Sequence, residues 1–192
     1  MKKIALNFAL CASLFTIASC GESNNETTDS KEMAKDANEE KFDDTKVEDD
    51  TKWAVSAADA GMWEVEVGKL ALKNGSAGEV KQFAQMMVDD HTAANKELMD
   101  MGAKKNITLP ASISNDKQDR LTEMAKKTGH DFDVAYMDQM VDDHQKVLNM
   151  FKDEADNGKD ADVKAWAASK VATLESHLQM AENGKKSVKD KK

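Results

Sequence analysis

The pentapeptide Met-Val-Asp-Asp-His occurs twice in this chain, at Met87–His91 and again at Met140–His144. Apolar residues recur around both copies at helical spacing, and a helix turns by about 100° per residue. Each histidine therefore falls within the apolar stripe of its helix and not on the solvated face. Two interpretations follow: the histidines are a polar pair buried for structural reasons, or two related helices direct metal ligands to one place.

The helical pattern continues on both sides of the repeat, and turn signals divide it. Asn74-Gly75, Asn157-Gly158 and Asn183-Gly184 are typical of helix ends. Ser76-Ala77-Gly78-Glu79 has the spacing of a capping box at a helix start. We expect long helices over residues 53–73, 77–104, 131–156 and 160–183, and a short helix over residues 116–127.

The lengths of the connections indicate how these helices pack. The first and last pairs are joined by tight turns, whereas a long segment containing the single proline, Pro110, joins the two middle helices. Such a link is long enough to cross the bundle and make the middle helices parallel, as in ferritin-like folds. We therefore predict an all-α, ferritin-like four-helix bundle over residues 51–184, with the short helix in the crossover. An antiparallel bundle whose link folds back on itself is the alternative.

The first twenty residues predict export and lipid attachment. Lys2 and Lys3 precede an apolar stretch that is too short to span a bilayer comfortably. The tetrapeptide that ends at Cys20 resembles the lipobox of bacterial lipoproteins, which implies a signal peptide over residues 1–19, cleavage before Cys20 and acylation of that cysteine. An ordinary signal peptide with an incidental cysteine is the alternative. Gly21 follows in place of the aspartate associated with inner-membrane retention, so an outer-membrane lipoprotein of the cell envelope is favoured.

Charge is concentrated in the segment that follows. Residues 21–50 hold twelve acidic residues against four lysines, out of a net charge of -9 for the chain. With almost no large apolar residue this segment cannot offset its ordering entropy, so we predict that residues 20–50 form a disordered acidic tether, with an r.m.s. span of about 30 Å. We also expect a disordered basic tail over residues 185–192. The acidic balance excludes nucleic acid as a partner; the membrane, reached through the lipid, is the partner that the sequence indicates, and protein partners stay unknown.

Several separated motifs resemble one family in order along the chain. They are Gly61–Leu72, Val80–Ala84, Asp90-His91, Ala94-Asn95, Ile107–Pro110, Phe132-Asp133, Tyr136-Met137, Asp143-His144, Leu174, His177-Leu178 and Ala181. Together they resemble the domain of unknown function 4142, over about residues 56–182. The resemblance implies a ferritin-like helical bundle in a bacterial envelope protein, and it implies no reaction.

If the two middle helices are parallel, His91 and His144 lie at the same height. Met87 and Met140 precede them by four residues and share their faces. Imidazole and thioether groups that converge in a dry site favour copper, with zinc as a second choice. A ferritin-type di-iron centre wants Glu-x-x-His spacing, and valine stands three residues before both histidines. His177 is an optional third ligand, whereas Glu64 is most simply part of a solvated flank.

Asp90 and Asp143 directly precede the two histidines, about 100° away on each helix, so neither reaches its own neighbour easily. We expect a crossed arrangement, in which Asp90 bonds His144 and Asp143 bonds His91. These pairs would orient metal ligands or form a polar network that fixes helix register.

Motifs for covalent catalysis are missing from the sequence. It contains no Gly-x-Ser-x-Gly, phosphate loop or His-Glu-x-x-His. We therefore expect a lipid-anchored envelope protein with a non-enzymatic binding or structural role. The alternative is a metal-binding protein that uses His91, His144, Met87 and Met140 for copper or zinc.

Overall fold

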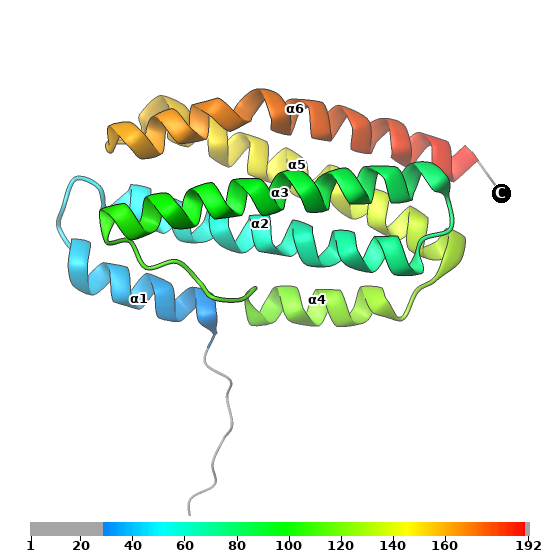
Figure 1. Ribbon diagram of the computed structural model, residues 1–192, viewed down its shortest axis with the longest axis horizontal. Helices are drawn as coiled ribbons and strands as arrows, with labels where there is room; N and C mark the ends of the chain where they lie inside the picture. Colours follow the sequence, from blue (N-terminus) through cyan, green and yellow to red (C-terminus); the bar gives the residue numbers. More distant parts are fainter. Residues whose placement is uncertain (1–28, 191–192) are drawn as a thin grey trace, which may run out of the picture.

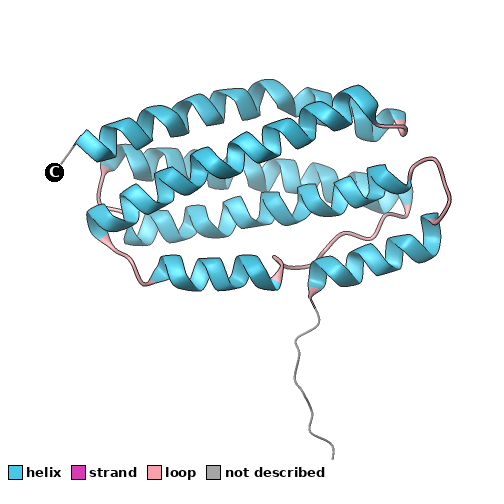
Figure 2. Cartoon of the chain, turned by 180° about the vertical axis from the view of Figure 1, so that it is seen from behind, coloured by secondary structure: helices cyan, strands magenta, loops and turns pink. Residues whose placement is uncertain are grey.

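The computed structural model describes residues 29–190, which form six α-helices and no strand. In chain order these are α1 (Ser30–Phe42), α2 (Glu48–Asn74), α3 (Gly78–Lys105), α4 (Asn115–Ala125), α5 (Gly129–Asn157) and α6 (Ala161–Asp190). The four long helices lie side by side as a bundle, and α1 and α4 run along one side of it (Figures 1 and 2). The predicted all-α bundle with a short helix in its crossover is confirmed, and α1 is an addition to it.

The chain direction in the bundle follows from the two kinds of connection. Tight turns join α2 to α3 and α5 to α6, while the segment that contains α4 returns along the outside of the bundle (Figure 1). As a result α3 and α5 run in the same direction, as do α2 and α6. The crossover arrangement is therefore the correct one, and the antiparallel alternative is wrong.

Two apolar clusters fill the bundle. One contains Trp63, Phe83 and Tyr136, and the other contains Trp53, Leu98 and Phe151. Along α3, α5 and α6 the histidines fall between the residues of the first cluster and those of the second. The polar centre thus lies at mid-height in the bundle, with apolar side chains above and below it.

Residues 29–50 correct the prediction of a disordered tether. Helix α1 occupies Ser30–Phe42, and α2 begins at Glu48, five residues before the expected start. The side chain of Asn38 is 2% exposed. Its amide group donates to the carbonyl of Thr108 at 2.8 Å and its oxygen accepts from the amide of Thr108 at 2.7 Å. Polar contacts to the crossover segment therefore dock α1, which composition alone did not reveal.

Buried aspartates of neighbouring helices hold both tight turns. Asp133 of α5 accepts hydrogen bonds from the backbone amides of Ser76 and Ala77 and from the hydroxyl of Ser76. Asp50 of α2 accepts bonds from the amides of Lys159 and Asp160. The predicted capping box is wrong, because Ala77 is the N-cap residue of α3 and the Ser76 hydroxyl donates to Asp133 instead.

The carboxyl-terminal prediction also needs correction. Helix α6 passes through Asn183-Gly184 and ends at Asp190, so residues 185–190 are helical and not a disordered tail. Val188 is 1% exposed, and Lys185 and Lys189 both form ion pairs with Asp138 of α5. Contacts across the bundle thus extend the helix. Within residues 29–190, every helix is too short or too polar to cross a membrane.

Candidate metal centre

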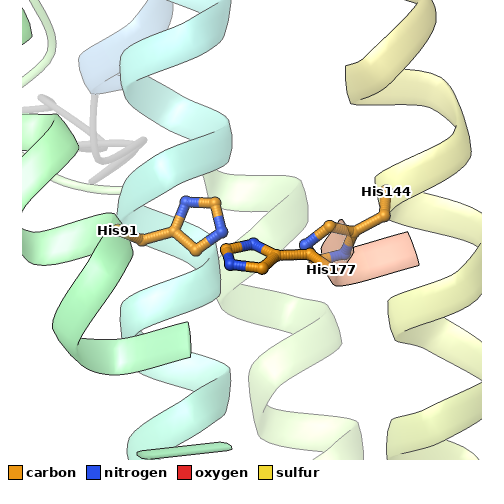
Figure 3. Close-up of side chains that lie close together, drawn as sticks. All are labelled: His91, His144 and His177. Atoms are coloured by element: carbon orange, nitrogen blue, oxygen red, sulfur yellow. The ribbon is translucent and has the colours of Figure 1, made fainter. Parts of the chain in front are cut away.

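Three histidine rings meet between the apolar clusters, and each comes from a different helix. His91 lies on α3, His144 on α5 and His177 on α6, and their rings turn toward one another (Figure 3). The ring centroids are 5.8 Å apart for His91 and His144, 5.6 Å for His91 and His177 and 5.5 Å for His144 and His177. One nitrogen can be chosen from each ring so that the three atoms lie within 4.8 Å of one another.

Hydrogen bonds set the proton positions on two of these rings. Nδ1 of His144 lies 2.9 Å from the carbonyl oxygen of Met140, which only accepts, so Nδ1 carries the proton. Nε2 of His177 lies 3.0 Å from Oδ2 of Asp90 and carries the proton there. The other nitrogen of each ring, Nε2 of His144 and Nδ1 of His177, is buried with no hydrogen-bond partner, as is Nε2 of His91. His144 and His177 therefore each keep a buried nitrogen with a free lone pair, and Nε2 of His91 is buried and unpartnered beside them.

Burial keeps these rings neutral. It lowers the pKa of His91 to about 3, with further contributions from His144 and His177. It lowers the pKa of His144 to about 4, and it lowers the pKa of His177 even though Asp90 acts in the opposite direction. A neutral imidazole is the form that binds a metal ion, so the centre has the right protonation state at neutral pH.

The donor set fits a single transition-metal ion. Zinc and copper both accept imidazole nitrogen, and two nitrogens on a tetrahedral zinc ion stand about 3.3 Å apart, since each Zn–N bond is about 2.05 Å. The separations of up to 4.8 Å exceed this value by about 1.5 Å, which small ring rotations can close. Asp90 and the Met140 carbonyl already hold the outer nitrogens, as is usual for metal-bound histidines.

The sequence model of one family, described as "Domain of unknown function (DUF4142)", matches residues 31–183. The chain belongs to this family. No curated protein and no solved structure matches it significantly. The DUF4142 match begins within α1 and ends within α6, so it spans all six helices and the three histidines.

The predicted pair His91 and His144 of this DUF4142 chain is brought together, and His177 completes the group. The predicted methionines take other positions. Met87 and Met140 are fully buried in the apolar cluster of Trp63, and neither lines the cavity that the three rings share. Met140 contributes its backbone carbonyl to His144 and not its sulfur.

The crossed aspartate arrangement is wrong. Asp90 bonds His177, because α6 and not α5 faces that side of α3. Asp143 instead accepts a hydrogen bond of 2.8 Å from the indole nitrogen of Trp63 and pairs with Arg120 of α4 at 3.4 Å. Because it contacts residues of both α2 and α4, Asp143 joins the crossover helix to the bundle. The Arg120 guanidinium also lies 4.8 Å from the Trp63 ring centroid.

Glu64 of α2 corrects a further expectation, since it is 2% exposed and not a solvated flank. Its Oε1 lies 3.9 Å from Nδ1 of His144, and its Oε2 has no hydrogen-bond partner. Burial, followed by the charge of Asp143, raises the pKa of this carboxyl well above its usual value. With Glu64, all four long helices contribute a polar group to the centre. The sequence did not reveal the burial of Glu64, because the buried residues of α2 lie on more than one face and form no single stripe.

The fourth histidine of the chain lies away from the centre. His130, at the start of α5, is exposed. The predicted lipidation residue, Cys20, lies outside the described residues.

Proposed function

We propose that the bundle binds one copper or zinc ion, and that this is its function. The ligands are Nε2 of His91, Nε2 of His144 and Nδ1 of His177. Asp90 and the Met140 carbonyl orient two of the rings. Three imidazoles without thioether sulfur favour Cu(II) or Zn(II) over Cu(I). The protein acts by binding and not as an enzyme.

The three unpartnered nitrogens are the observation that supports this proposal. A purely structural histidine network would be expected to satisfy its buried nitrogens, since an unsatisfied buried polar atom costs about 1–3 kcal/mol. Here three such atoms occur on three adjacent rings, one on each. A metal ion would satisfy all three at once.

Tag-free protein, stripped with a chelator, tests the proposal. We expect one equivalent of zinc or Cu(II) by elemental analysis after gel filtration. His144→Ala and His177→Ala should each weaken binding at least tenfold in calorimetric titrations. His130→Ala is the matched control, because this histidine is exposed and remote, and it should bind as the wild type does. Wild-type affinity in His144→Ala, or no bound metal in the wild type, would overturn the proposal.

The methionines give a second comparison. Met87→Leu and Met140→Leu keep the side-chain volume close to that of methionine and remove the sulfur. Because neither side chain lines the cavity of the three rings, we expect unchanged zinc and Cu(II) affinity. A large loss of copper affinity in either variant would restore the thioether ligands to the site.

We also propose that the protein is an envelope lipoprotein anchored through Cys20. The tetrapeptide that ends at Cys20 and the basic and apolar stretch before it support this proposal. In cells fed a radiolabelled fatty acid, the protein should carry label and fractionate with the outer membrane. Cys20→Ala should abolish both. Labelling that persists in this variant would refute the anchor.

A further inference from the structure

A cavity of about 280 Å³ opens beside the three histidines. All three rings line it, together with side chains from the four long helices. On the α2 and α3 side the lining residues are small, among them Ala60, Gly61 and Ala94, whereas on the α5 and α6 side they include the larger Phe151, Trp166 and Leu174. The space adjoining the candidate metal centre is therefore mostly apolar and has aromatic walls.

Most of the charged residues that line this cavity have a partner, and the exception is Glu64, whose Oε2 is buried without a hydrogen-bond partner. Lys170 pairs with Glu97, and its ammonium lies 5.4 Å from the centroid of the Trp166 ring. Asp90 is bonded to His177. Glu64 approaches the His144 ring at Nδ1, the nitrogen that already bonds to Met140, and not at the nitrogen that is left for a metal. The three histidines would fill three positions of a tetrahedral metal ion and leave a fourth position.

Three-histidine sites with an open fourth position are typical of metals that bind an exchangeable water or an added ligand. We propose that a metal ion in this centre keeps one coordination position open toward the cavity, and that this position takes a small nitrogen-donor ligand with a flat apolar body, such as an imidazole or a pyridine. This inference rests on the proposed metal site and adds the class of ligand.

The size and walls of the cavity set that class. An apolar cavity of about 150 Å³ already admits benzene, so 280 Å³ holds a five- or six-membered ring. The rings of Phe151 and Trp166, 5.8 Å apart, offer edges and faces for aromatic packing. A small inorganic anion would use the coordination position and gain nothing from the walls.

Two ligands added to the Cu(II)-loaded protein test the inference. Imidazole probes both the open position and the cavity, whereas azide probes the position alone. We expect both to change the visible and electron paramagnetic resonance spectra while one equivalent of copper stays bound after gel filtration. Imidazole should bind at least tenfold more tightly than azide.

A variant that fills the cavity separates the two parts of the inference. Ala94 lies one helical turn after His91 and lines the cavity, so Ala94→Leu should lower imidazole affinity at least tenfold and azide affinity less than threefold. Ala103→Leu, the same change at an exposed position of α3, is the control and should alter neither. If Ala94→Leu fails to fold, Ala60→Leu fills the cavity from α2.

The contrary results are distinct from failure of the metal site. Copper that binds but whose spectra do not respond to imidazole would overturn this inference and leave the proposed function standing. Equal losses of imidazole and azide affinity in Ala94→Leu, or no loss of either, would show that the cavity does not receive the ligand. No copper binding at all would instead refute the metal site itself.

Discussion

Hydrogen bonds fix the tautomer and the orientation of two of the three histidine rings. His144 donates a hydrogen bond from Nδ1–H to a backbone carbonyl, and His177 donates one from Nε2–H to Asp90. In both rings the remaining nitrogen is buried and has a free lone pair. Each ring is therefore fixed in one tautomer and one orientation before any ligand arrives, which lowers the ordering cost of binding.

The lowered pKa values of the histidines predict an unusual pH profile for zinc binding. Three ordinary histidines, with pKa near 6.5, would lose roughly several hundredfold in affinity between pH 7 and 5.5, because all three must be deprotonated. With the pKa of His91 at about 3 and that of His144 at about 4, we expect less than a tenfold loss. Competition with a chromophoric chelator of known pH dependence measures it. A fall beginning at pH 6.5 would contradict the burial argument.

Glu64 predicts a pH-dependent stability. Its folded-state pKa is raised above the ordinary value of 4.5, so its stabilising contribution is present below about pH 4.5 and is lost as pH rises, when only the unfolded chain ionises the group freely. Glu64→Gln removes this loss. In metal-free protein we expect the melting temperature of Glu64→Gln to exceed that of the wild type by more at pH 8 than at pH 4.5.

Glu66→Gln supplies the control for this comparison, because the Glu66 side chain is 44% exposed on the same helix. It should show no gain that grows with pH. An equal gain for Glu64→Gln at both pH values would mean that the buried carboxyl does not resist ionisation.

At the scale of helices, the polar contacts that hold α1 and the end of α6 could not be predicted from the sequence. The long helices were predictable to within a few residues at most ends, because apolar periodicity and Asn-Gly turns mark them. Helix α1 buries only Ala34 and Asn38, so no stripe distinguishes it from a solvated segment. The last turns of α6 depend on Val188 and on ion pairs with Asp138, which no local pattern in the tail reveals.

Asn38 gives the first test of these docking contacts. Asn38→Ala removes both hydrogen bonds to the Thr108 backbone and leaves buried groups unpaired, so we expect a loss of about 1–3 kcal/mol in the free energy of unfolding. Glu40→Ala, at an exposed position of α1, should change it by less than about 0.5 kcal/mol. Urea unfolding monitored by circular dichroism compares the two, and similar values would show that α1 is only loosely attached.

Asp133 tests the turn between α2 and α3. Asp133→Ala strips the backbone amides of Ser76 and Ala77 of their acceptor, and we expect a loss of about 2–3 kcal/mol in the free energy of unfolding. Asp142→Ala changes an exposed aspartate of the same helix and should cost little. If both variants have the melting temperature of the wild type, the turn does not need the Asp133 carboxylate.

The candidate site was predictable to the extent that it follows helical periodicity. His91 and His144 sit within apolar stripes, and the parallel crossover brings them to one level. Their partners depend on which helix faces which, and this is set by packing across the bundle. Asp90 therefore meets His177 and Asp143 meets Trp63, although neither pair has any signature in local sequence.

On the scale of the whole molecule, the candidate centre joins the two halves of the bundle. His91 belongs to the α2–α3 hairpin, while His144 and His177 belong to the α5–α6 hairpin. Zinc at one hundred times its dissociation constant should add about 2.7 kcal/mol to the stability of the folded state. For a chain of this size that corresponds to about 5–11 °C in melting temperature.

Differential scanning calorimetry with and without zinc measures this shift. His91→Ala removes the only histidine ligand from the α2–α3 hairpin, so this variant should have the same melting temperature with and without zinc. His130→Ala should respond as the wild type does. A full shift in His91→Ala would show that zinc stabilises the protein from elsewhere.

The docking of α1 also changes how far the protein could reach from a bilayer. If Cys20 is acylated, only residues 21–28 separate the lipid from the first described residue, Asp29, and a fully extended stretch of this length covers about 30 Å at most. A disordered tether of thirty residues could have extended to about 100 Å. The bundle would then lie within about 30 Å of the headgroups, where it would meet ions and small molecules that concentrate at the membrane surface.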